Sequence, residues 1–131
     1  MILYHIMIVY MHINLITEKC YIGSTKYSME ERLKQHRISA LKDESSTYFH
    51  KELRKWPEET WLSVVLQNCY SECEMLQAEA AWIMLTSADD PEVGYNSRNE
   101  LHNLCRLISD RKLNNSHISS TLTVRSKSKK I

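Results

Sequence analysis

Glycine is scarce in this sequence, with two among 131 residues against a usual share of about 7%. Both glycines stand beside a tyrosine, in Tyr21-Ile22-Gly23 and in Gly94-Tyr95-Asn96. A chain that otherwise avoids glycine places it where the backbone needs φ > 0 or where another group comes close. Each glycine therefore predicts a tight turn or a close approach, and the alternative is two ordinary turns.

The sequence also lacks the cysteine pattern of a zinc site. Of its four cysteines only Cys69 and Cys73 are close together, whereas zinc sites of known pattern bring two closely spaced pairs. Cys20 lies in a strand-like run, so we interpret the cysteines as small buried side chains. Because no convincing secretory signal precedes them, reduced thiols and an intracellular protein, cytoplasmic or nuclear, are expected.

A membrane segment is not expected either. The apolar run over residues 1–16 has no basic start and is interrupted by His5, His12 and Asn14. It is also shorter than the about 20 residues that span a bilayer. We interpret it as a strand, and we expect no membrane partner.

The composition places the chain among globular proteins, because 43% of the residues are hydrophobic and 25% are charged. The net charge of +1 hides an uneven distribution. Residues 1–96 hold 9 Lys and Arg against 14 Asp and Glu, a balance of −5, whereas residues 97–131 hold 8 against 2, a balance of +6. A basic stretch of this kind is either a phosphate-binding arm or a solvated end.

The hydrophobic pattern predicts an α+β domain. Ser28 with Glu31 and Ser71 with Glu74 have the spacing of capping boxes at helix starts. The expected strands cover residues 3–13, 20–22 and 61–67, the first two joined as a hairpin, and the expected helices cover 29–42, 47–55 and 72–86, with a further helix within 101–113. The last dozen residues are expected to be disordered.

Two helices carry residues that call for a chemical explanation. On the first, Arg32 and His36 lie four residues apart beside an apolar stripe of Met29, Leu33, Ala40 and Leu41, so both can face one site or, alternatively, solvent. On the third, Glu79 shares a face with Leu76 and Ile83, which is the face directed to the core. A carboxylate there needs a cationic side chain or a metal ion as partner.

Read together, these residues resemble the GIY-YIG endonuclease family. The elements stand in the family's order and spacing: Ile8-Val9-Tyr10, after ten intervening residues Tyr21-Ile22-Gly23, then Arg32 with His36, Glu79 three residues before Trp82, and Gly94-Tyr95-Asn96. The resemblance covers residues 8–98. One departure is Ile8, which stands where the family has a glycine.

The resemblance implies a small central three-stranded sheet flanked by helices, an α/β sandwich. It also implies a set of site residues, Tyr10, Tyr21, Arg32, His36, Glu79 and Asn96. In the family's terms, Glu79 is expected to hold one Mg²⁺ or Mn²⁺ and Arg32 to steady the scissile phosphate. Tyr10 is expected to deprotonate the attacking water with help from Tyr21 or His36, and Asn96 to brace the site.

The expected function is therefore a metal-dependent endonuclease that hydrolyses phosphodiester bonds of DNA, favoured as a mobile-element or homing type. Residues 1–98 are expected to form the nuclease domain and residues 99–131 a basic, partly disordered tail, which shows no zinc-finger or helix-turn-helix pattern. Two alternatives stay open. One is a nucleic-acid-binding module of the same fold with impaired catalysis, which Ile8 favours, and the other is a structure-specific repair nuclease subunit.

Overall fold

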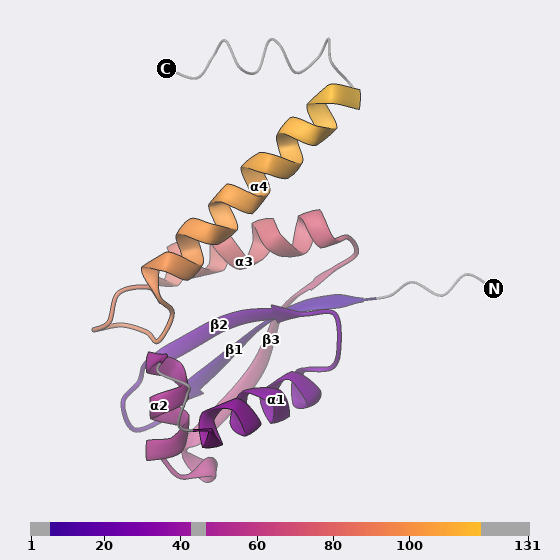
Figure 1. Cartoon of the computed structure of the whole chain (residues 1–131). Coiled ribbons are helices and arrows are strands. Elements are labelled where there is room, and N and C mark those ends of the chain that lie inside the picture. Colours follow the sequence, from indigo (N-terminus) through magenta and orange to yellow (C-terminus); the bar gives the residue numbers. More distant parts are fainter. Residues whose placement is uncertain (1–5, 43–46, 119–131) are drawn as a thin grey trace, which may run out of the picture.

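A computed structural model describes residues 6–42 and 47–118. Three antiparallel strands form one sheet in the order β2-β1-β3, with helices α1 and α2 on one side of it and α3 and α4 on the other (Figure 1). The strands are β1 (Met7–Asn14), β2 (Cys20–Thr25) and β3 (Trp61–Cys69), and the helices are α1 (Met29–Leu41), α2 (Tyr48–Lys55), α3 (Glu72–Thr86) and α4 (Arg98–Ile118), with a 3-10 turn η1 (Glu58–Thr60) before β3. The predicted α+β class is confirmed.

The helices and the hairpin turn begin at the polar residues that the sequence predicted. Ser28 and Ser71 each accept a hydrogen bond from the backbone N–H three residues later, at 3.1 Å, and so begin α1 and α3. Between β1 and β2, the Asn14 side chain accepts two backbone N–H bonds of 3.0 Å and holds the hairpin turn. The expected residues 3–5 of the first strand lie outside the described residues.

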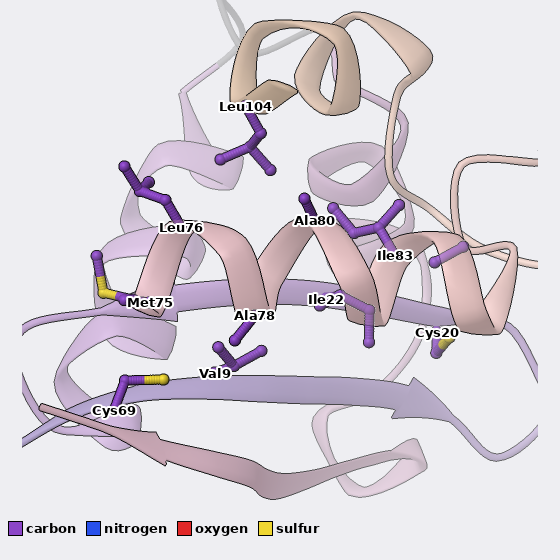
Figure 2. Packing of buried hydrophobic residues seen from close by; sticks show 11 residues of the cluster. Val9, Cys20, Ile22, Cys69, Met75, Leu76, Ala78, Ala80, Ile83 and Leu104 are labelled. Atoms are coloured by element: carbon purple, nitrogen blue, oxygen red, sulfur yellow. The ribbon is translucent and has the colours of Figure 1, made fainter. Parts of the chain in front are cut away.

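The face of the sheet under α3 carries the apolar core. Alternation along the strands sends Val9 and Ile22 to this face, where both are fully buried. Figure 2 shows these side chains meeting the helix, and Ile83 of α3 is likewise fully buried. The prediction that the face of α3 with Leu76, Glu79 and Ile83 is directed to the core is thereby confirmed.

The opposite face, under α1 and α2, is aromatic rather than aliphatic. We call Tyr10, His12, Tyr21, His36 and Phe49 the aromatic layer, because their rings contact one another there. The apolar stripe expected on α1 is confirmed in part. Ala40 is buried and Leu33 packs against the same cluster, whereas Leu41 is 78% exposed and the buried position one turn before Ala40 is His36. A histidine is turned inward there because the surface that α1 covers is the aromatic layer and not an aliphatic core.

Helix α4 packs against α3 and contains the helix expected within residues 101–113, with further residues at both ends. Leu104 is buried in this contact, and Leu101 and Ile108 pack beside it. The residues expected to be disordered, the last dozen, lie outside the described residues. No helix in the described part is long and apolar enough to cross a membrane.

The cysteine prediction holds in part. All four cysteines are free, and Cys20 and Cys69 are buried as expected, while Cys73 is partly exposed and Cys105 is exposed on α4. Among the described residues, no group of three or more His, Cys, Asp or Glu side chains is arranged to hold a metal ion.

Candidate active site at the edge strand β2

The phenol of Tyr10 lies against the backbone of Gly23. The two residues pair across β1 and β2, and a Cβ atom added to Gly23 would stand 2.5 Å from Cζ of Tyr10. The backbone φ of Gly23 is not positive. Of the two explanations offered for this glycine, the close approach is therefore the right one, because any larger residue would occupy the space of the Tyr10 ring.

The second glycine marks another close approach. Gly94 pairs with Cys20 along the free edge of β2, and Tyr95 N–H donates to the Cys20 carbonyl at 2.8 Å. A Cβ atom on Gly94 would stand 2.5 Å from the backbone of Ala88 and 2.7 Å from the Cys20 carbonyl oxygen. The Gly94-Tyr95-Asn96 segment can therefore run beside β2 only with glycine at its start.

Asn96 completes this edge strand. Its side chain accepts from Ile22 N–H and donates to the Ile22 carbonyl, both at 2.8 Å, and it is 4% exposed. An amide that satisfies both backbone groups of one residue replaces a neighbouring strand at that point. This geometry agrees with a bracing role for Asn96.

His36 reaches from α1 to Tyr10. Its Nε2 lies 3.0 Å from the Tyr10 hydroxyl, and the imidazole is 4% exposed. Burial, with the positive charge of Arg32 as the next cause, lowers the pKa of His36 to about 3. Burial likewise raises the pKa of Tyr10 well above its usual value. Both groups are therefore neutral at pH 7, joined by one hydrogen bond.

Tyr21 is packed into the same layer by aromatic contacts. Its ring stacks on Phe49 of α2, with centroids 3.9 Å apart and planes 3° from parallel. It meets His36 edge-on at 5.4 Å. Burial raises the pKa of Tyr21 well above the usual value. In this position the phenol is neutral at pH 7.

Glu79 approaches β2 from the α3 side of the sheet. Its carboxylate accepts a 2.5 Å hydrogen bond from the hydroxyl of Ser24 on β2. Within residues 6–42 and 47–111, no lysine or arginine forms an ion pair with it. Burial raises the pKa of Glu79, the Ser24 bond lowers it, and the nearby negative charge of Glu100 raises it further. Glu79 is thus a partly buried carboxylate. Of the two partners expected from the sequence, a cationic side chain or a metal ion, the first is not found within those residues.

Arg32 is the cation whose charge acts on both halves of the site. Its charge lowers the pKa of Tyr10 and that of Glu79, and its Nη1 donates to Gln35 of its own helix at 3.0 Å. A guanidinium whose charge acts on a phenol and on a carboxylate can also attract an anion such as a phosphate. The arrangement suits charge stabilisation during attack on a phosphodiester.

Two histidines of the aromatic layer and its surroundings escaped the sequence reasoning. His12 is fully buried, its Nδ1 lies 2.8 Å from the Ser63 hydroxyl, and its ring stacks on Phe49. His50 of α2 lies beside His36. Strand alternation places His12 two residues after Tyr10 on the same face, which was an available signal. Nothing local in the sequence marks His50.

The sequence profile of the GIY-YIG catalytic domain matches residues 6–96, most of the chain. The chain belongs to the GIY-YIG family. This is a family of phosphodiesterase nucleases, so the predicted family and enzyme class are confirmed, and the natural substrate class of such a domain is nucleic acid. No curated protein sequence matches the chain.

Two solved structures share the fold of this GIY-YIG domain. The catalytic domain of the intron endonuclease I-TevI, in a single-residue variant, is 22% identical, with 70% of this chain and 92% of that chain covered and a TM-score of 0.60. A structure of the catalytic domain of the homing endonuclease I-TevI is also 22% identical, with 70% and 97% covered and a TM-score of 0.58. At this identity the likeness concerns the fold.

Proposed function

We propose that the protein is a metal-dependent endonuclease that hydrolyses phosphodiester bonds of DNA at the edge of β2. One observation carries the proposal. The Arg32 charge acts on both a buried phenol, Tyr10, and a desolvated carboxylate without a cationic side-chain partner in the described part of the chain, Glu79. This combination supports a site that binds an anionic phosphate and activates a water beside it.

The carboxylate of Glu79 fits a hard divalent cation. A partly buried charge with a raised pKa is stabilised by a cation, and carboxylate oxygens are the ligands that Mg²⁺ and Mn²⁺ prefer. Glu79 would hold the ion, with the Ser24 hydroxyl next to it. The bound ion would supply Lewis acidity toward the phosphate oxygens.

The remaining steps belong to the side chains of this protein. Arg32 binds and orients the scissile phosphate and stabilises its growing negative charge. Tyr10 accepts the proton of the attacking water, and because burial raises its pKa, this requires that its own proton first move to His36 Nε2. Tyr21 forms the aromatic wall beside them, and Asn96 holds β2 in place.

The homing or mobile-element type is part of the same proposal. It is supported by the fold shared with an intron endonuclease domain and by the charge balance of +6 over residues 97–131. We assign residues 1–98 to the nuclease domain and residues 99–131 to a basic DNA-binding extension. Its first part is α4, which is anchored on α3 through Leu104.

Supercoiled plasmid tests the proposal. Purified protein should convert it to nicked or linear DNA with Mg²⁺ or Mn²⁺ and leave it intact with chelator. A matched Arg32→Lys variant, which keeps the charge but loses the planar fork, should bind the plasmid and cut it far more slowly. Binding by the parent with no cleavage under any metal condition would instead support the impaired module, for which Ile8 gives a specific reason.

A further inference from the structure

A chain of hydrogen bonds leads away from the proposed base. Tyr10 Oη lies 3.0 Å from His36 Nε2, and the other ring nitrogen of His36, Nδ1, lies 3.0 Å from His50 Nε2. These hydrogen bonds therefore connect β1 to α1 and α1 to α2. The two imidazole rings have centroids 5.2 Å apart, so the contact is direct.

The protons of such a chain are ordered. A neutral imidazole has one N–H donor and one acceptor nitrogen. When Tyr10 donates its O–H to His36 Nε2, His36 must donate its Nδ1–H to His50 Nε2. A shift of each proton by one bond leaves Tyr10 as phenolate, His36 neutral as the Nε2–H tautomer, and His50 as imidazolium.

We propose that His50 is a positioning residue that fixes the tautomer of His36 and takes up the proton that Tyr10 gives away. The inference rests on the proposed function, because it explains how Tyr10 becomes able to accept the proton of water. One O–H bond breaks at Tyr10 and one N–H bond forms at His36 Nε2. At the same time one N–H bond breaks at His36 Nδ1 and one forms at His50 Nε2. Tyr10 then takes a proton from the attacking water, and His50 releases its extra proton to solvent.

The burial of the three groups favours this direction. Tyr10 and His36 are 1% and 4% exposed, and a charge held on either is poorly solvated. His50 is only partly buried. Its pKa is lowered by burial and by the charges of Arg32 on α1 and Arg54 on α2, so it takes the proton transiently rather than keeping it. His36 passes a proton on because its own pKa, about 3, does not allow it to stay charged.

The first experiment is chemical rescue. His50→Ala should keep α2, because alanine favours helices, and should lower the single-turnover rate of plasmid cleavage about 10²-fold. Free imidazole should enter the space left by the ring and restore cleavage in proportion to its concentration. Mg²⁺ is the metal of choice here, since it prefers oxygen ligands to imidazole. The control is Tyr70→Ala, which removes an exposed ring at the end of β3, outside the site and the basic extension, and should change neither the rate nor the response to imidazole.

The second experiment does not depend on cleavage. Long-range ¹H–¹⁵N NMR spectra distinguish histidine tautomers, and His36 should carry its proton on Nδ1 in the parent. His50→Gln should keep this tautomer, since the amide oxygen can accept the bond, yet should cut slowly because an amide takes up no proton. In His50→Ala the preference for the Nδ1–H tautomer should be lost.

The outcomes separate the two claims. A parent that cuts DNA while His50→Ala cuts equally well overturns the role of His50 and leaves the proposed function intact. A folded His50→Ala that is slow and unaffected by imidazole also overturns it. A parent that does not cut DNA removes the proposed function. The tautomer of His36 then still tests the role of His50, because a proton on Nε2 of His36 in the parent would show that His50 does not fix this tautomer.

Discussion

Replacing Gly23 with alanine should damage the site more than the fold. The added Cβ would stand 2.5 Å from Cζ and 2.9 Å from Cε1 of Tyr10, whereas carbon atoms pack at about 3.5–4.0 Å. The ring must therefore move by about 1 Å, and its hydroxyl must leave His36 Nε2. A displacement of that size at a reacting group lowers the rate about 10²-fold.

The stability of this variant should fall modestly. Breaking the hydrogen bond leaves the Tyr10 hydroxyl and the His36 nitrogen with no partner in a buried setting, which costs about 1–3 kcal/mol. In a domain of this size, each kcal/mol lowers the melting temperature by about 4 °C. Thermal melts and plasmid cleavage by the same preparation would give both quantities.

Gly94→Ala is the matched control, because its Cβ would meet backbone instead of the end of a side chain. The backbone of Ala88 lies 2.5 Å from that position, and the segment would have to leave β2. Overpacking costs about 1–3 kcal/mol, and each backbone hydrogen bond broken adds about 1 kcal/mol. Gly94→Ala should therefore lose more stability than Gly23→Ala. A Gly23→Ala variant that melts and cuts like the parent would refute the placement of Tyr10 over this glycine.

Three further results are expected. Arg32→Lys should lose most cleavage and little DNA affinity, because the bidentate contact matters most in the transition state; a proportional fall of affinity and rate in binding and cleavage assays would make Arg32 a binding residue. The pKa values of about 4 for His12 and about 3 for His36 lie below the unfolded value of about 6.5, so the folded state binds fewer protons than the unfolded state. Urea melts should therefore show the free energy of unfolding falling as pH drops from 6.5 toward 4, by about 1.4 kcal/mol per pH unit for each histidine. Equal stability at pH 7 and pH 5 would contradict the burial of these histidines. Deletion of residues 113–131 should reduce the salt dependence of DNA binding, by about 0.9 in the slope of log K against log salt for each phosphate that these residues neutralise, and an unchanged slope would mean that they neutralise none.

The sequence predicted most elements because their signals are local. Capping serines, the polar hairpin turn and the apolar runs act within a few residues, so the bounds expected for α3, Glu72 to Thr86, agree with the structure. The stripe expected on α1 was wrong at Leu41 for a nonlocal reason. Which side of a helix turns inward depends on the surface that it covers, and here that surface is the aromatic layer.

The sequence predicted only those site residues that a motif, strand alternation or helix periodicity marks. The pairing of Gly23 with Tyr10 follows from the hairpin register. The tyrosines were found through family spacing, and Glu79 was found through its place on the core-directed face of its helix. His50 was not, because its contact with His36 exists only once α2 packs on α1. The Ser24 partner of Glu79 was missed as well, since a hydroxyl carries no pattern that would single it out.

Thermal melts of Glu79→Gln with and without Mn²⁺ test the proposal that Glu79 holds a divalent ion at the edge of β2. Burial raises the pKa of Glu79 in the folded state, so its charge destabilises the fold above the unfolded pKa of about 4.3. Without metal at pH 7, the amide variant should melt no earlier than the parent. Mn²⁺ should raise the melting temperature of the parent, as binding to the folded state alone requires, and leave that of the variant unchanged. A variant that melts early, beside a parent that does not respond to Mn²⁺, would mean that Glu79 holds no metal ion and serves only the fold.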